Sequence, residues 1–153
     1  MTSWVEFERL APDFGEGARR LLVGSDGVAI AFLATVTQAS APRLAPFCPI
    51  FCGDHVYLSA GARTPKVRDL RTKKVYAIHA FLGKNDEEFQ FSGASSEVTD
   101  ARERAAVHEA IPFAAFDKRD PIFRLIVERV LWVHWERVGQ PDTRAVRKHW
   151  VSP

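Results

Sequence analysis

Hydrophobic and polar positions along this chain follow two different periods. Near the amino terminus, the apolar residues of Trp4–Leu10 and Phe14–Val23 recur at helical spacing, and Pro12 separates the two segments. Farther along, short runs in which apolar and polar residues alternate are bounded by turn residues, which is the pattern of strands. These runs cover residues 32–36, 42–51, 55–59, 74–80 and 88–98. The pattern therefore predicts two amino-terminal helices followed by a mainly β body.

One later segment, Ile122–Val138, fits both periods. Its apolar residues alternate as in a strand, while Ile122, Leu125 and Ile126 also lie on one helix face. The many β-branched and aromatic side chains of the segment favour a strand. The segment Arg144–Trp150 that follows is either a last strand or a tail.

A helix start signal precedes that ambiguous segment. Asp100 is followed three residues later by Glu103, which is the spacing of a capping box. Pro112 cannot continue a helix, so we expect the helix to run through Ala110. The short apolar run Phe113–Phe116 is then expected to pack against the body.

The segment Ala62–Leu70 carries the most distinctive chemistry of the chain. Thr64 can cap a helix whose first residue is Pro65, a position at which proline loses no donor. Arg63 and Lys66 then flank the positive end of the helix dipole, so a phosphate would meet backbone donors, a hydroxyl and two cations. A Thr-Pro pair also opens many helices that hold no ligand, and the local sequence alone leaves both interpretations open.

Length and composition set the remaining bounds. The chain has 153 residues, enough for one domain with one core, and its 46% hydrophobic and 26% charged residues are typical of a soluble globular protein. A net charge of +2 is too small for a nucleic-acid surface, which needs concentrated positive charge. The basic residues are dense only between positions 63 and 74, which fits a local phosphate better than a long polyanion.

The sequence predicts neither a leader nor a membrane segment. Residues 1–6 lack a basic region followed by an apolar run, and no stretch approaches the ~18 apolar residues of a spanning helix. We therefore expect a cytoplasmic protein. Cys48 and Cys52 agree with this expectation, because within one strand their Cα atoms would lie roughly 13 Å apart, beyond disulfide reach. Both are expected as buried thiols.

Other catalytic constellations are weak in this sequence. The histidines at 55, 79, 108, 134 and 149 show no metal-ligand spacing, so no metal site is expected. Ser59 and Ser92 lack a nucleophile elbow, and the cysteines form no redox pair. Trp132, Trp135 and Trp150 fit core or interface positions more readily than a place over a planar cofactor. No catalytic residue is assigned.

The order of the predicted elements, three strands, a short helix and two strands, resembles the flavin-binding split barrel of the pyridoxamine 5′-phosphate oxidase-like superfamily. The resemblance covers Val28 to Val138. In that superfamily, a Ser/Thr-Pro-Lys motif after the third strand holds the phosphate of flavin mononucleotide (FMN), and Thr64-Pro65-Lys66 stands at that place. Segments 66–70, 73–78 and 92–94 are also similar to family patterns. The implied fold is mainly β with short helices, a six- to seven-stranded antiparallel split barrel.

The resemblance also implies a set of cofactor-binding residues. The flavin ring would lie along the second strand, bordered by Arg43, Pro46, Phe47 and Cys48. The ribityl-phosphate end would be held by Ser59, Arg63, Thr64 and Lys66. The second-strand positions depend on register, since a shift of one residue turns each side chain to the other face.

The resemblance further implies a homodimer with a flavin at each interface and a small molecule as substrate. We expect the segment Arg144–Trp150 to reach the partner's site. The chain departs from the vitamin B6 oxidases, because it has Glu88 where they carry a glutamine, with Gln90 two positions later. Their arginine-rich carboxy-terminal signature is also not placed in residues 137–142. The resemblance therefore implies the cofactor platform and not that substrate.

The expected arrangement is one domain over residues 1–153. Amino-terminal helices occupy 1–24, the barrel 28–138, and a carboxy-terminal strand or tail 139–153. The expected function is an FMN-dependent oxidoreductase acting on a small molecule, with no nucleic acid or membrane as partner. Two alternatives remain: a relative that binds the deazaflavin cofactor or haem in the same groove, and a non-catalytic protein that stores or senses a flavin.

Overall fold

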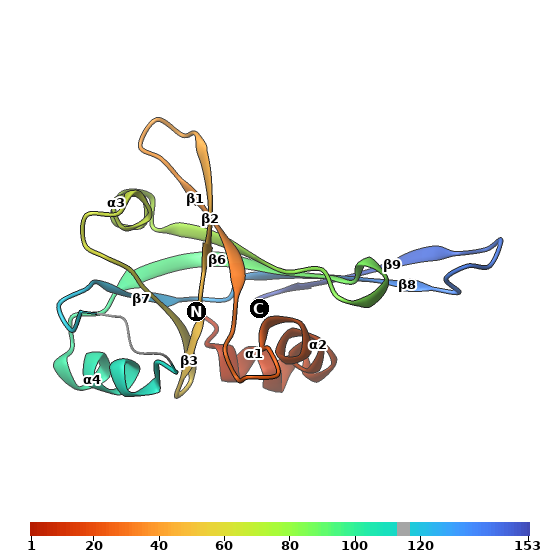
Figure 1. The fold of residues 1–153 in the computed structure, drawn as a ribbon, viewed down its shortest axis with the longest axis horizontal. Helices are drawn as coiled ribbons and strands as arrows, with labels where there is room; N and C mark the ends of the chain where they lie inside the picture. Colours follow the sequence, from red (N-terminus) through yellow and green to blue (C-terminus); the bar gives the residue numbers. More distant parts are fainter. Residues whose placement is uncertain (113–116) are drawn as a thin grey trace.

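The computed structural model describes residues 1–112 and 117–153. Two helices precede a mainly antiparallel β body, as the sequence predicts (Figure 1). The expected packing of Phe113–Phe116 lies outside the described residues. The elements in chain order are α1 (Trp4–Leu10), α2 (Pro12–Leu22), β1 (Ala31–Val36), β2 (Pro42–Phe47), β3 (Ile50–Cys52), β4 (His55–Ser59), α3 (Pro65–Lys73), β5 (Val75–Ala80), the 3₁₀ turn η1 (Lys84–Asp86), β6 (Glu88–Glu97), α4 (Ala101–Ala110), β7 (Ile122–Leu125), β8 (Arg129–Glu136) and β9 (Arg144–Val151).

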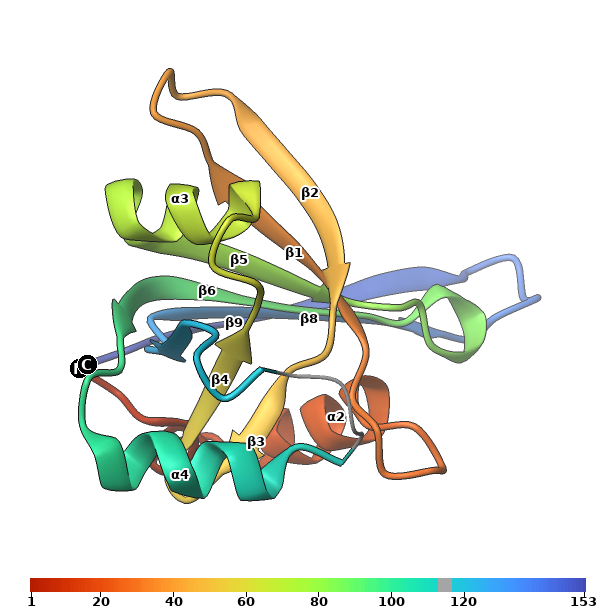
Figure 2. The same ribbon diagram turned by 60° about the vertical axis from the view of Figure 1, so that its left-hand side comes forward.

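Strand β6 joins the two halves of one sheet. Its first part, 88–92, pairs with β8, and its last part, 95–97, pairs with β7. One half therefore runs in the order β2-β1-β5-β6-β8-β9 and the other in the order β6-β7-β4-β3, with every pair antiparallel. The sheet curls between the halves (Figure 2), which confirms the predicted split barrel.

The change of partner along β6 takes place at Gly93. A β-carbon at this position would lie 2.0 Å from the carbonyl oxygen of Ile126, too close for any side chain. The link between β7 and β8 crosses here, where the Ile126 N–H donates to Ala94 O and the Glu128 N–H donates to Ser92 O, each at 2.9 Å. Glycine is therefore required because two backbones approach closely.

The sheet has nine strands over the described residues, more than the six or seven expected, because two predicted strands are each divided. The predicted strand 42–51 breaks at Cys48 and Pro49, since proline has no N–H for a ladder and restricts the residue before it. The predicted strand 122–138 breaks between Leu125 and Arg129, at the crossing over Gly93. The segment after it is a strand, β9, and not a tail.

The main core lies between the sheet and the amino-terminal helices. Phe7, Phe89 and Phe91 are fully buried there, and the ring centroid of Trp4 lies 5.2 Å from that of Phe91. Helices α1 and α2 therefore cover one side of the sheet (Figure 1). A smaller core surrounds Val107 beneath α4. None of the described helices combines the length and the apolar character needed to cross a membrane.

Candidate functional site

Helix α3 begins without a side-chain cap. Thr64 has the extended backbone of an N-cap residue (φ −73°, ψ 147°), but its side chain accepts no bond from the first turn. Pro65 occupies the first helical position, and the first turn contains no acidic residue. The earliest helical bond is a long one, from the Arg68 N–H to Thr64 O at 3.4 Å. The N–H groups before it are free by the geometry of any helix, and no carboxylate of the first turn balances the dipole.

Two buried hydroxyl groups on the segment that leads into α3 lack a hydrogen-bond partner. Ser59, the last residue of β4, is 8% exposed. Neither its Oγ nor Thr64 Oγ1 finds a partner among the described residues. A buried hydroxyl left unpaired costs about 1–3 kcal/mol, so native structures nearly always satisfy it. Thr64 Oγ1, at the N-cap position itself, therefore has a hydrogen bond to donate to an anion bound at this helix start.

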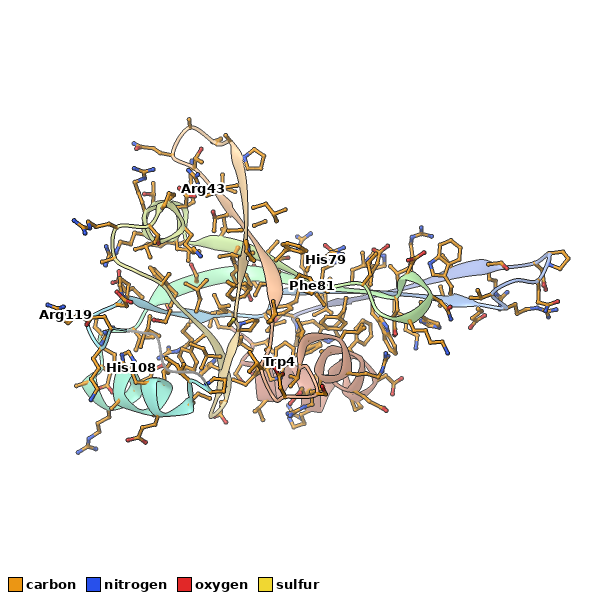
Figure 3. The ribbon with its side chains drawn as sticks, in the orientation of Figure 1. Trp4, Arg43, His79, Phe81, His108 and Arg119 are labelled. Carbon is orange, nitrogen blue, oxygen red and sulfur yellow. The ribbon has the colours of Figure 1, made fainter. Side chains whose placement is uncertain are left out.

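The start of α3 also forms one wall of an open pocket of about 700 Å³. Arg63 and Thr64 line this wall, and the segment Asp117–Asp120 lines the opposite one. Arg119 on the far wall is paired with Asp117 at 2.6 Å and lies at the edge of the molecule (Figure 3). The arginine on the near wall, Arg63, has no ion-pair partner among the described residues, whereas the arginine on the far wall is already paired.

The far wall is held in place from α4. Arg104 donates to the carbonyl oxygens of Lys118 and Asp120, at 3.0 and 2.9 Å. Sequence reasoning missed this wall, because the contact joins segments that are distant in the chain and neither Arg104 nor Asp117–Asp120 belongs to a motif. The run Asp-Lys-Arg-Asp at 117–120, with charges of both signs next to a proline, is the one signal that a sequence offers.

Lys66, the other predicted cation, is half-buried and lies close enough to Cys48 to influence its thiol. Burial raises the pKa of the Cys48 thiol, and the positive charge of Lys66 partly opposes this effect. The structure thus brings the predicted phosphate end and the predicted ring border within electrostatic range. Cys48 and Cys52 are free and half-buried, and Cys48 lies between β2 and β3 instead of sharing a strand with Cys52.

Arg43 has a partner that the sequence pattern did not indicate. Its Nε donates to Asp69 Oδ2 of α3 at 2.7 Å, and Thr35 Oγ1 donates to the same oxygen at 2.8 Å. Asp69 is only 2% exposed, so these donors compensate a buried charge. Figure 3 shows Arg43 beside α3. Arg43 therefore fixes β2 against α3, and its predicted contact with a ring stays a prediction.

The remaining second-strand residues of the predicted site face both ways. Pro46 is exposed and pairs in register with Phe32 of β1, whereas Phe47 is 9% exposed and belongs to the main core. A ligand lying along β2 can contact only one of these two side chains. Their roles likewise stay predictions.

The face of the sheet opposite the main core exposes several large apolar side chains. Phe32 and Phe81 stack with ring centroids 4.8 Å apart. Figure 3 shows His79 and Phe81 together on this side, across the sheet from Trp4. Patches of this kind on soluble proteins mark interaction surfaces. The outer apolar face, as we call it, comprises Ile30, Phe32, Leu44, Pro46 and Phe81.

A second charged cluster lies beneath α4 and is fully paired. Glu103 Oε1 accepts from the Tyr57 hydroxyl at 2.8 Å and from Arg124 Nη2 at 2.7 Å. Burial disfavours ionisation of Glu103, but these hydrogen bonds outweigh it and lower its pKa. Burial and the bond to Glu103 raise the pKa of Tyr57 to about 12. Because each of these groups has its partner, the cluster serves the fold.

No family model matches the sequence, and no curated protein matches it. The fold, however, matches solved structures. A pyridoxamine 5′-phosphate oxidase-related, FMN-binding protein from Nostoc punctiforme is 13% identical, with a TM-score of 0.57 over 95% of this chain and 97% of that one. A NimC/NimA family protein from Clostridium acetobutylicum is 12% identical, with a TM-score of 0.58 over 78% and 84%.

A third solved structure, a haem-binding protein from Mycobacterium smegmatis, is 18% identical with a TM-score of 0.55 over 76% of this chain. This chain spans about half of it, 52%. At these identities the likeness concerns the fold. The chain has the split-barrel fold of the pyridoxamine 5′-phosphate oxidase-like, FMN-binding proteins, as its sequence resemblance implied.

Proposed function

We propose that this protein binds FMN with its phosphate at the start of α3 and uses it as an oxidoreductase on a small organic substrate. The observation that carries the proposal is the uncapped start of α3, where Thr64 Oγ1 and, five residues earlier in the chain, Ser59 Oγ are buried without a hydrogen-bond partner among the described residues. A phosphate would accept from both hydroxyls and from the free N–H groups, and its charge would be balanced by Arg63 and Lys66.

The division of labour between protein and cofactor follows from this placement. FMN, when bound, supplies the electron transfer. The chain then has to hold the phosphate, for which Ser59, Arg63, Thr64 and Lys66 are the candidates. It also has to border the ring, for which the residues around Cys48 are the candidates. The absence of an acid–base dyad at this end of the described chain is compatible with such a role.

We further propose that a second copy of the chain covers the outer apolar face and completes the site. Leu44 on this face is 67% exposed and Phe32 is 38% exposed, which is costly for side chains of this size in an isolated molecule. The same side of the sheet continues into a groove of about 220 Å³ lined by Gln90, Arg129 and His149, among others. Strand β9 forms the edge of this groove, which supports the expected reach of Arg144–Trp150 toward a partner.

The proposed cofactor is tested by the absorption spectrum of the purified protein, with mass spectrometry of the small molecule released on denaturation. A flavin spectrum and released FMN, followed by turnover with a nicotinamide donor or oxygen, support an oxidoreductase. Bound FMN without turnover on any substrate favours storage or sensing. A shifted absorption maximum together with released deazaflavin would show that the bound cofactor is the deazaflavin and not FMN. A colourless protein that takes up no added flavin overturns the proposal.

The proposed dimer has its own test in Leu44→Asp. This change places a charge on the outer apolar face without entering the core. We expect the wild type to elute as a dimer and the variant as a monomer, measured by light scattering during size exclusion. Asp26→Asn, at an exposed turn, is the control and is expected to leave the dimer intact.

Haem is a second candidate, because His79 on the outer side of the sheet has one ring nitrogen that could bind iron. His79 Nδ1 donates to Ala80 O at 2.6 Å, so that Nε2 is the ring nitrogen left to bind a metal, and Glu88 Oε2 lies 4.0 Å from it. The fold likeness to a haem-binding protein supports the same candidate. A Soret band after reconstitution with haem that is lost in His79→Ala would favour haem over FMN.

A further inference from the structure

A separate pocket of about 350 Å³ lies at the carboxy-terminal end of α3, where the helix meets the start of β5 and the end of β6. These three segments come together at the left-hand side of Figure 2. The start of α3 is nine residues and about 13 Å away along the helix. We call this site the α3 C-terminal pocket; its lining residues include Leu70, Arg71, Lys74, Ser95, Glu97 and Phe123, all different from those at the start of α3.

The β6 wall of this pocket carries a buried hydroxyl without a partner. Ser95 is 5% exposed, and its Oγ has no hydrogen-bond partner among the described residues. Ser95 and Glu97 alternate with Ser96 along β6, so their side chains project from the same face of the sheet. That face is the one on which α3 packs, because Arg71 of α3 donates to Glu97 at 2.7 Å. The Ser95 hydroxyl therefore projects toward α3, and native structures nearly always satisfy such a buried group.

Lys74 is fixed directly beside this hydroxyl by two backbone hydrogen bonds. Its N–H donates to Leu70 O at 3.1 Å and ends the helix, and its carbonyl oxygen accepts from the Ser95 N–H at 2.8 Å. Its backbone is left-handed (φ 56°, ψ 25°), a conformation that glycine usually supplies at this position. No carboxylate of the described residues pairs with the Lys74 ammonium, since Glu97 pairs with Arg71. A cation without a partner therefore lies next to a hydroxyl without a partner.

Arg71 is held by Glu97 in a way that leaves donors for a ligand. Its Nε donates to Glu97 Oε2 at 2.8 Å, and its Nη2 donates to Glu97 Oε1 at 2.7 Å. A guanidinium has five N–H groups, so Nη1 keeps both of its own beyond this pairing. The pocket thus offers a hydroxyl, an ammonium and part of a guanidinium, against one carboxylate that is already matched. These donors fit an anion with two acceptor oxygens.

Two further properties of the pocket select the kind of anion. Its inner side is apolar, because Leu70 and Phe123 are side chains of the main core, each 1% exposed. A hydrocarbon chain can lie against them, whereas a sugar or a second charged group would find no partner there. The carboxy-terminal end of a helix also carries partial negative charge, which disfavours a doubly charged phosphate more than a singly charged carboxylate.

We propose that the α3 C-terminal pocket binds a small aliphatic monocarboxylate. One carboxylate oxygen accepts from Ser95 Oγ and the other from the Lys74 ammonium, with Arg71 Nη1 as a further donor. The hydrocarbon chain lies toward Leu70 and Phe123. Glu97 keeps its own bonds to Arg71 and orients the guanidinium. This site shares no residue with the proposed phosphate site at the start of α3, so either site can exist without the other.

The test is a titration of the full chain with butyrate, followed in ¹⁵N correlation spectra. We expect the backbone N–H signals of Lys74, Ser95 and Glu97 to move in a saturable way, while those of Arg63 and Thr64 at the other end of α3 stay in place. Butyramide has nearly the same size and shape but no charge. It should bind more weakly by about tenfold or more, because it lacks the charge-assisted contacts.

Ser95→Ala tests the buried hydroxyl. We expect butyrate to bind about tenfold more weakly, because a hydrogen bond to a charged group is lost. Without butyrate, the variant should be at least as stable as the wild type, since the removed hydroxyl has no partner. Ser96→Ala is the matched control. Ser96 also borders the pocket, but it pairs in register with Arg124 and its side chain lies on the α4 side of β6, so the affinity should not change.

Lys74→Gln tests the charge, with Lys73→Gln as its matched control. The Lys73 ammonium donates to Ser40 Oγ at 3.3 Å, away from the pocket, so only the change at Lys74 should weaken butyrate binding. The proposal is overturned by the absence of saturable shifts, by shifts centred on the start of α3, or by equal losses in a variant and its control. A loss of stability in Ser95→Ala without butyrate also overturns it, because the hydroxyl would then be satisfied within the fold.

Discussion

Helices α3 and α4 start in opposite ways, although both carry a signal for an N-terminus in the sequence. At α4, Asp100 accepts from the Glu103 N–H at 2.8 Å, and both residues bring negative charge to the positive end of the dipole. At α3, Thr64 makes no capping bond, and the nearby charges, Arg63 and Lys66, are positive. One helix start is capped by its own chain, and the other has no side-chain cap and is where we propose that a phosphate binds.

The polar side chains around the starts of α4 and α3 differ in the same way: those at α4 are paired, and those at α3 are not. Glu103 does not return to the backbone as in a reciprocal capping box but accepts from Tyr57 and Arg124. Around α3, by contrast, Ser59 and Thr64 carry hydroxyls without partners in the described part of the chain. Pairing within the chain therefore distinguishes a structural cluster from a binding site better than the presence of charged residues does.

The largest effect is expected from Glu103→Ala, which breaks the satisfied cluster. Arg124 and Tyr57 lose their acceptor, and because Arg124 is about one-third exposed we expect a loss of roughly 2–3 kcal/mol in the free energy of unfolding. Urea unfolding measures it. Glu109→Ala, exposed on the same helix, is the control, and an equal loss there would mean that α4 is merely intolerant of substitution.

Lys66→Ala tests the proposed phosphate contact at the uncapped start of α3. We expect FMN binding to weaken by about 1.5–3 kcal/mol, because a charge-assisted contact to the phosphate is lost, while riboflavin is affected much less. Fluorescence titration with both ligands measures the difference. Lys73→Ala at the other end of α3 is the matched control. Equal losses for FMN and riboflavin would assign Lys66 to the fold instead of the phosphate.

The two caps can be compared directly. Asp100→Ala removes a capping bond and should cost about 1 kcal/mol of stability. Thr64→Ala removes a hydroxyl that has no partner, so the protein without FMN should lose close to nothing while its affinity for FMN falls. Thermal unfolding of both variants with and without FMN gives the comparison. A large stability loss in Thr64→Ala without ligand would show that Thr64 caps α3 after all.

The smallest expected effect is a change in the stability of the fold at acidic pH. The pKa of Glu103 is lowered in the fold from its ordinary value of 4.5. Its contribution is therefore fully present above about pH 4.5 and is lost as the pH falls through the lower folded value. Glu103→Gln should consequently lose less stability than the wild type between pH 5 and pH 3. Parallel curves for the two proteins would contradict the assignment.

Much of the fold was predictable because its signals are local. Alternation marked the strands, Pro12 separated α1 from α2, and Asp100 with Glu103 marked α4. The division of 122–138 was not predictable, because alternation continues through the crossing at Gly93 while the pairing partner changes. Strand order was equally hidden, since β4 pairs with β7 across a long stretch of chain.

The candidate site was predictable in part for the same reason. The Thr64-Pro65-Lys66 motif is contiguous, so sequence alone located the helix start. The opposite wall of the pocket, around Arg119, is formed by tertiary packing through Arg104, and no local sequence pattern predicts it. Likewise, the sequence identified Arg43 as a candidate, but it did not show that Arg43 Nε donates to Asp69. What a charged residue pairs with depends on the fold, and the pairing decides its role.

The proposed phosphate site is tested most directly by comparing how tightly the wild-type protein binds FMN and riboflavin, which differ by the phosphate alone. Fluorescence titration of the protein freed of any ligand measures both affinities under the same conditions. Because the start of α3 offers hydroxyls, N–H groups and two cations to the phosphate, we predict that FMN binds about tenfold to a hundredfold more tightly. Equal affinities, or no binding of either, would contradict an anion site at α3.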